Sequence, residues 1–135
     1  MGCSRRAGGS LARDSPTRAS CVSAPLLANN ICMLVHSVYF WFKPDADPAL
    51  VAAFEAGLAQ LTRIPDVVTA YFGRPEATPS RPVVDASYAW ALVEVFADLA
   101  AHDRYQEHPI HQEFLRQFSG SWQKVQVYDV RASER

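Results

Sequence analysis

Nine consecutive residues near the start of the apolar part of the chain, Leu34-Val35-His36-Ser37-Val38-Tyr39-Phe40-Trp41-Phe42, are mostly β-branched or aromatic. This composition favours a β-strand that is covered on both faces. Because side chains alternate along a strand, one face holds His36, Val38, Phe40 and Phe42, and the other holds Val35, Ser37, Tyr39 and Trp41. A single domain has to bury only one face of a sheet, so the aromatic second face suggests that another subunit covers it.

The next segments predict a helix, a strand and a long loop. Asp47 and Pro48 form a strong helix start, a capping carboxylate followed by proline, and the helix pattern reaches about Thr62. Its expected buried face holds Leu50, Phe54, Leu58 and Leu61. Residues 67–72 then predict a strand that Gly73 closes, and residues 74–85 contain too many prolines for a regular element.

The rest of the chain predicts a strand, two helices and a final strand. Residues 86–96 predict the third strand, in which Tyr88, Trp90, Leu92, Glu94 and Phe96 share a face. Asp98 caps a short helix, with His102 and Asp103 expected on its solvated surface, and Pro109 opens another helix as far as Phe118. With a last strand over residues 122–130, the order is β-α-β-β-α(α)-β, the ferredoxin-like α+β fold with a four-stranded antiparallel sheet.

The first 32 residues differ from the rest. They are rich in Ser, Ala, Arg and Gly, hold all three cysteines, and carry a net charge of +3, against -4 for residues 33–135. We therefore expect an N-terminal extension (1–32), one folded domain (33–131) and a short C-terminal tail (132–135). The extension is a disordered tail, a targeting segment or the product of a mis-assigned start before Met33. No cysteine falls in the domain, which favours a reducing, cytoplasmic compartment.

The overall charge excludes some classes of partner. The formal net charge is -1, so neither nucleic acid nor an anionic membrane is expected as the main partner. No apolar run reaches the roughly 18 residues that suggest a membrane span. No motif indicates haem or flavin, and we expect no cofactor.

The most unusual segment is Tyr105-Gln106-Glu107-His108-Pro109-Ile110-His111. Proline suits the first position of a helix, so His108 precedes this helix and His111 lies inside it. His111 shares a helix face with Phe114, Leu115 and Phe118, which follow it at three, four and seven residues. An ionisable imidazole therefore occupies a position on an apolar helix face.

Several strings of the sequence resemble the stress-responsive A/B barrel (Dabb) domain family: Val35-His36, Phe42-Lys43-Pro44-Asp45, Ile64-Pro65-Asp66-Val67, Phe72-Gly73-Arg74, Val95-Phe96, Val127-Tyr128-Asp129 and, above all, the Tyr105–His111 segment. The resemblance covers residues 33–130. It implies a homodimer in which two four-stranded sheets face each other as a dimeric α/β barrel. Many members are associated with stress, and one plant member is a cofactor-independent cyclase that performs an aldol-type cyclisation of a polyketide.

The resemblance to that cyclase also implies site residues. Its catalytic histidine aligns with His111, a supporting tyrosine with Tyr105, and a first-strand pocket histidine with His36. His111 would then be a general base, and Tyr105 would orient it or donate a hydrogen bond to an oxyanion. The chain departs from the cyclase at Trp90, where that enzyme has a pocket histidine, and near Gly57, where it has a tyrosine.

Three roles for His111 stay open from the residues alone: a structural hydrogen bond to a strand carbonyl or to Tyr105, the wall of a pocket for a small hydrophobic molecule, or a catalytic base. The expected pocket residues are Val38, Phe40, Trp90, Leu92, His108 and Phe114, and the expected dimer interface residues are Tyr39, Trp41 and Val93. The cluster of His108, His111 and Glu113 could suggest metal ligands. Because His108 lies outside the helix while His111 points inward, we expect no metal site there.

Overall fold

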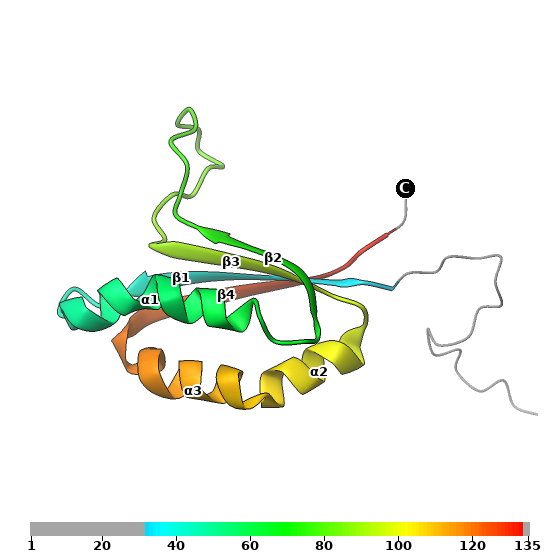
Figure 1. Ribbon diagram of the computed structural model, residues 1–135. Helices are drawn as coiled ribbons and strands as arrows, with labels where there is room; N and C mark the ends of the chain where they lie inside the picture. Colours follow the sequence, from blue (N-terminus) through cyan, green and yellow to red (C-terminus); the bar gives the residue numbers. More distant parts are fainter. Residues whose placement is uncertain (1–31, 134–135) are drawn as a thin grey trace, which may run out of the picture. The chain divides into compact units, whose positions relative to one another are not determined.

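A four-stranded antiparallel sheet carries its helices on one face in the computed structural model, which describes residues 32–133 (Figure 1). The strands and helices, in chain order, are β1 (Leu34–Phe42), α1 (Pro48–Leu61), β2 (Val67–Gly73), β3 (Trp90–Phe96), α2 (Leu99–Glu107), α3 (Pro109–Phe118), the 3₁₀ turn η1 (Ser119–Ser121) and β4 (Trp122–Arg131). The strand order in the sheet is β2-β3-β1-β4. The ferredoxin-like α+β fold predicted from the sequence is confirmed. Predictions for residues 1–31 lie outside the described residues.

Strand β1 is central, and its faces are those expected from the alternation. His36, Val38 and Phe40 are buried toward the helices. In the pairing with β3, His36 lies opposite Glu94, and in the pairing with β4 it lies opposite Asp129. Side chains at paired positions share a face, so this register places three ionisable groups side by side on the helix-covered face of the sheet.

Helix α1 follows the predicted capping pattern. The Asp47 side chain accepts a hydrogen bond from the Ala49 backbone N–H at 2.9 Å, and Pro48 occupies the first helical position. Three members of the expected apolar face, Phe54, Leu58 and Leu61, are buried, while Leu50 is half-buried against the same core.

The third strand begins at Trp90, so the predicted start at Ala86 was wrong. Pairing with β1 ends at Phe40 opposite Trp90. Before that point, Ser87 makes hydrogen bonds to side chains. Its backbone N–H donates to the Asp85 carboxylate at 2.8 Å, and its hydroxyl accepts the Trp41 indole N–H at 3.0 Å. Residues 74–89 consequently form a loop that extends away from the sheet on the side opposite the helices (Figure 1).

The junction between α2 and α3 is made by His108. Its extended backbone ends α2, and its Nδ1 accepts the Ile110 backbone N–H at 3.1 Å, which caps α3 ahead of Pro109. Helix α3 buries His111, Phe114 and Phe118. None of the helices within residues 32–133 is long and apolar enough to cross a membrane.

Helix α3 approaches α1 closely at Gly57. A Cβ atom at this position would lie 2.6 Å from Cε2 of Phe118 and 3.2 Å from Cδ2 of Phe114. The absence of a side chain at Gly57 therefore lets two aromatic rings of α3 rest directly on the backbone of α1.

Candidate functional site

A cavity of about 160 Å³ lies between the helix-covered face of the sheet and helices α2 and α3. Its walls are mostly apolar, with a few polar groups from β1, α2 and α3. The lining residues are His36, Val38, Phe40, Leu61, Leu92, Tyr105, Gln106, His111, Phe114, Leu115, Trp122, Val125 and Val127. Val125 and Val127 of β4 are 38% and 41% exposed, so the cavity reaches solvent along this edge strand.

Two residues expected in the pocket, Trp90 and His108, do not line this cavity. Trp90 is buried farther along β3, next to Phe54 and Phe72, and the Arg74 guanidinium lies 4.8 Å from the centre of one of its rings. His108 caps α3. The other four expected pocket residues, Val38, Phe40, Leu92 and Phe114, contribute to the cavity wall.

His111 and Tyr105 lie together in the cavity wall, with ring centres 4.7 Å apart. Burial lowers the pKa of His111, and the neighbouring His36 and His102 lower it further. The Gln106 carbonyl raises the pKa of His111 and so opposes part of this shift. The same carbonyl accepts a hydrogen bond from the Gln112 side-chain amide at 2.7 Å. The buried Nδ1 of His111 makes no hydrogen bond within the described residues. The imidazole is therefore neutral near pH 7, with a buried nitrogen that has no hydrogen-bond partner there.

The Tyr105 hydroxyl faces Glu94, an acid on the covered face of β3 that is 0% exposed. Burial raises the pKa of Glu94 to about 7, and the Tyr105 hydroxyl opposes part of that rise. Burial, followed by the Glu94 charge, also raises the pKa of Tyr105, which keeps the phenol protonated. Neither carboxyl oxygen of Glu94 meets hydrogen-bond geometry among residues 32–133.

Glu94 was not among the candidate residues, although the sequence carried a signal for it. It alternates with Trp90, Leu92 and Phe96 along β3, and this whole face is buried. A glutamate within an apolar strand face is as unusual as a histidine within an apolar helix face, because the buried charge is costly.

His36 lines the cavity, and its side chain is paired with Asp129 of the neighbouring strand β4. Its Nδ1 lies 2.5 Å from Oδ1 of Asp129, whose side chain is 45% exposed. On the other side, the His36 ring lies 4.8 Å from the ring of His102 and 6.4 Å from that of Tyr105.

His102 does not lie on a solvated surface, so that expectation was wrong. Its side chain is 14% exposed, because its ring packs edge-on against Phe96 at 5.2 Å as well as against His36. Burial lowers the pKa of His102, and the positive charge of a protonated His36 would lower it further. Asp103, in contrast, is exposed as expected.

The face of the sheet opposite the helices carries the expected interface residues. Tyr39 and Trp41 lie against Tyr88 of the long loop, at 5.0 and 6.3 Å between ring centres. Val93 is half-buried in the same face. Other large side chains are more open, with Tyr71 at 70% and Tyr128 at 58% exposure.

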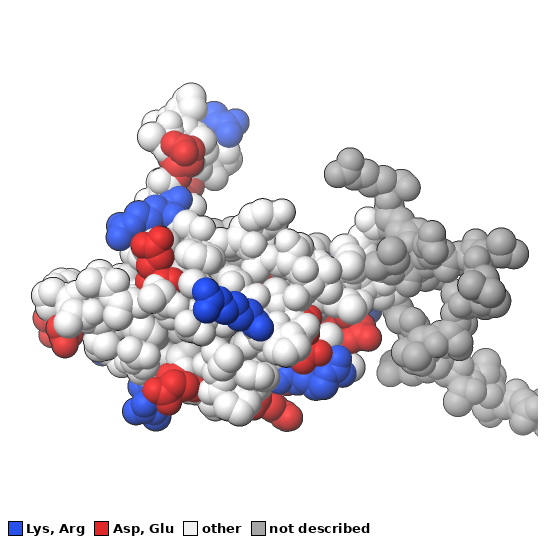
Figure 2. Space-filling view, viewed as in Figure 1, with Lys and Arg blue, Asp and Glu red and all other residues white. Residues whose placement is uncertain are grey.

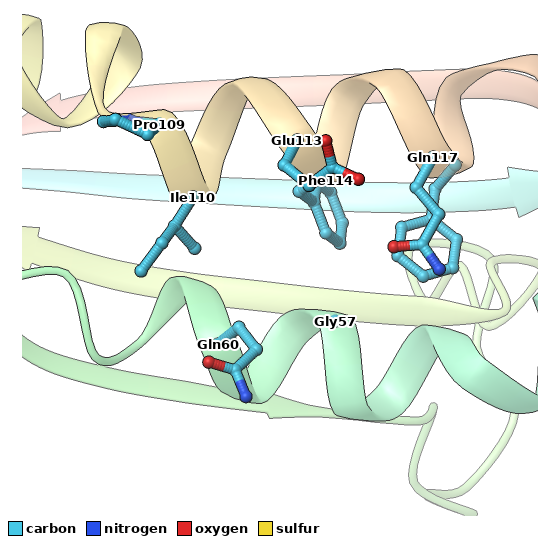
Figure 3. Close-up of a pocket in the computed structure, with 8 residues that line it drawn as sticks. Gly57, Gln60, Pro109, Ile110, Glu113, Phe114 and Gln117 are labelled. Atoms are coloured by element: carbon cyan, nitrogen blue, oxygen red, sulfur yellow. The ribbon is translucent and has the colours of Figure 1, made fainter.

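A second and larger hollow, of about 330 Å³, is a groove between α1 and α3 (Figure 3). Glu113 is the one ionisable residue that lines this groove. Its carboxylate is paired with Arg116, whose Nε donates a hydrogen bond to it at 2.9 Å. Acidic and basic side chains are interspersed over the molecular face in Figure 2, without a large patch of one sign. The smaller cavity, which gathers His36, Tyr105 and His111, is therefore the better candidate for a functional site.

Solved structures of similar fold include a Dabb family protein from Mesorhizobium loti, with 26% identity over 76% of this chain and 98% of that one and a TM-score of 0.60. A hydroxynitrile lyase from Passiflora edulis aligns at 17% identity over 78% and 97%, with a TM-score of 0.65. A dimeric ferredoxin-like protein of unknown function from Thermobifida fusca aligns at 19% over 78% and 96%, with a TM-score of 0.63.

Among curated proteins, none matches this chain. The model of the stress responsive A/B barrel domain matches residues 34–132, from the first residue of β1 to just past the end of β4. That span contains the strands and helices of the described residues and every residue of the cavity, and the chain therefore belongs to the stress responsive A/B barrel domain (Dabb) family.

Proposed function

We propose that this chain forms a homodimer and binds a small, mainly apolar molecule in the cavity between the sheet and helices α2 and α3. The observation that supports this proposal is the lining of the cavity, which is apolar except for a few polar groups that include His36, Tyr105 and His111. Ligand sites commonly combine an apolar wall with a few polar groups that orient the ligand. A volume of about 160 Å³ suits a ligand with one aromatic ring and a single carbonyl or hydroxyl oxygen.

Binding of acetophenone, a one-ring ketone, tests this proposal. We expect added acetophenone to shift the NMR signals of the His111 ring and of the Leu92 and Leu115 methyl groups. Val127→Trp should abolish these shifts, because a larger side chain at this half-open position of β4 fills the cavity entrance. Val83→Trp is the control, since Val83 is 83% exposed in the loop. Shifts confined to the α1–α3 groove, at Ile110 and Gln117, would contradict the proposal.

A second candidate function is cofactor-independent lyase or cyclase chemistry with His111 as the general base. The observation in its favour is the neutral imidazole of His111, whose Nδ1 makes no hydrogen bond within the described residues, beside a phenol that stays protonated. His111 would remove a proton from the carbon next to a carbonyl, and the electron pair would move to the carbonyl oxygen. Tyr105 would donate a hydrogen bond to the resulting enolate oxygen.

This chemistry can be tested without knowing the natural substrate. In D₂O, we expect the protein to accelerate hydrogen–deuterium exchange at the methyl group of acetophenone. His111→Gln should remove the acceleration while NMR shifts still report binding, and Tyr105→Phe should weaken it. Because the pKa of His111 is lowered, the rate should already be level near pH 7. Exchange that rises steadily with hydroxide concentration, or that survives in His111→Gln, would refute a role for His111 as base.

The proposed homodimer rests on the aromatic face of the sheet that no helix of residues 32–133 covers. Tyr39, Trp41 and Val93 lie in this face, and the exposed rings of Tyr71 and Tyr128 flank them. A second copy of the same face would remove this aromatic surface from water in an isologous contact.

Sedimentation equilibrium at micromolar concentration should therefore give about 30 kDa, twice the 15.0 kDa of one chain. Tyr39→Glu should shift the protein to a monomer, since it places a charge in the centre of the contact. Leu99→Glu, at an apolar side chain that is 63% exposed on α2, is the control and should leave the dimer intact. A wild-type monomer would contradict this part of the proposal.

A further inference from the structure

Three potential metal ligands from separate elements converge at the edge of the cavity: His36 from β1, His102 from α2 and Asp129 from β4. One ligand atom from each lies within 4.8 Å of the other two. We propose that these residues form a binding site for a divalent first-row transition metal ion of the zinc or ferrous type. The inference goes beyond the proposed function, because base chemistry at His111 needs no metal ion.

The fold itself brings the three side chains together. His36 and Asp129 are directly paired across β1 and β4, so both side chains lie on the face that the helices cover. Helix α2 is fixed over this face by its buried residues Ala101 and Tyr105, and His102, between them, packs against the His36 ring. The cluster therefore does not depend on a loop.

The hydrogen bonding of His102 supports its proposed role as a metal ligand. Its buried Nδ1 has no hydrogen bond within residues 32–133, and the nearby Asp103 carboxylate is 3.9 Å away, beyond hydrogen-bonding distance. The other ring nitrogen lies 3.1 Å from the side-chain amide nitrogen of Gln106. A buried nitrogen without a partner costs free energy, and coordination would remove that cost.

The donor set indicates which ions would bind. Two imidazoles and one carboxylate are the protein ligands of many catalytic zinc sites and of the non-haem iron sites with two histidines and one acid. Calcium and magnesium prefer oxygen ligands alone, so they would be poorly matched here. Three protein ligands leave at least one coordination position for water or for an oxygen of a bound molecule.

Coordination requires a small adjustment of the side chains. With metal–ligand bonds of about 2.0–2.1 Å, ligand atoms in a tetrahedral site lie about 3.4 Å apart. The Nδ1 of His36 and the Asp129 carboxylate at 2.5 Å would have to separate, and the widest separation of 4.8 Å would have to shorten. The Asp129 side chain is 45% exposed, so it has room to rotate. Since His36 also lines the cavity, the ion would lie in the cavity wall.

Cobalt binding to the full-length chain tests the site. After chelator treatment, we titrate the protein with Co²⁺ and record visible absorption, then displace Co²⁺ with Zn²⁺. We expect one His-ligated Co²⁺ per chain. His102→Ala and Asp129→Asn should each weaken binding at this site more than about 10-fold, because even losing a partner of a ligand costs 10–100-fold. Zn²⁺ should also raise the melting temperature of the wild type but not of His102→Ala.

His108→Asn is the matched control. It removes another histidine of the α2–α3 region, keeps a good helix cap, and should bind Co²⁺ like the wild type. All variants share the rest of the chain, so any cobalt bound elsewhere is common to them and cancels in the comparison. Binding that is unchanged in His102→Ala and Asp129→Asn, or that falls equally in His108→Asn, would overturn the proposal. The cluster would then be a hydrogen-bonded His36–Asp129 pair with a packed His102.

Discussion

Phe54→Ala should lower the free energy of unfolding by about 3–5 kcal/mol, a large part of the 5–15 kcal/mol that typically stabilises a domain. Phe54 of α1 is 0% exposed and lies at the centre of the aromatic core. Its ring packs against rings from the sheet and α3, namely Phe40, Phe42, Trp90, Phe114, Phe118 and Trp122. Truncation leaves a void between the two layers that these large rings cannot fill by small movements.

Urea unfolding followed by tryptophan fluorescence measures this loss, since Trp90 and Trp122 border the void. Leu99→Ala is the control, because Leu99 is 63% exposed on α2 and its truncation should change stability by less than about 0.5 kcal/mol. A loss below about 1 kcal/mol for Phe54→Ala would mean that the two layers close around the void.

Glu94→Gln should stabilise the protein at alkaline pH and have little effect at acidic pH. The pKa of Glu94 is raised from 4.5 to about 7 by burial, so the folded protein binds this proton more tightly than the unfolded chain does. The contribution of Glu94 to the free energy of unfolding is therefore greatest below pH 4.5. It falls as the pH rises from 4.5 to 7 and is lowest above pH 7. At about 1.4 kcal/mol per pH unit, the total penalty is about 3 kcal/mol.

Urea unfolding of wild type and Glu94→Gln at pH 5 and pH 8.5, with a chelator present, measures the difference. The titratable groups that face Glu94 are His36 on β1 and Tyr105 on α2, and both are retained in the variant. Any effect of these two groups is therefore common to both proteins. Glu107→Gln, at an exposed position at the end of α2, controls for the loss of a surface charge. An equal gain at both pH values would contradict this prediction, because it would show that the folded protein does not hold the Glu94 proton at pH 5.

Local patterns predicted most of the fold. The alternation in Leu34–Phe42 assigned both faces of β1, and Asp47-Pro48 located the start of α1, because these signals depend on neighbouring residues only. The spacing of Phe114 and Phe118 from His111 likewise predicted which side of α3 is buried.

The parts that sequence reasoning missed depend on contacts between distant segments. The third strand starts late because its pairing with β1 ends at Phe40, although β1 itself continues to Phe42, and the composition of residues 86–89 does not reveal this. His102 belongs to a short polar helix, yet it is half-buried because β1 presents His36 beneath it. Trp90 lies on the expected face of β3 but too far along the strand to reach the cavity, and only the register determines that distance.

The contact at Gly57 has a consequence for the dimensions of the cavity, although Gly57 does not line it. Phe114 and Phe118 rest on this glycine, and His111 lies on the same helix one turn before Phe114. A helix moves as a rigid body over so short a distance, so the spacing between α1 and α3 also determines how deeply His111 extends toward the sheet. A side chain at this position would have to displace the Phe118 ring or move α3 away from α1, and a movement of α3 would change the depth of the cavity. The smallest residue of α1 thus sets the spacing of two helices from a position outside the cavity.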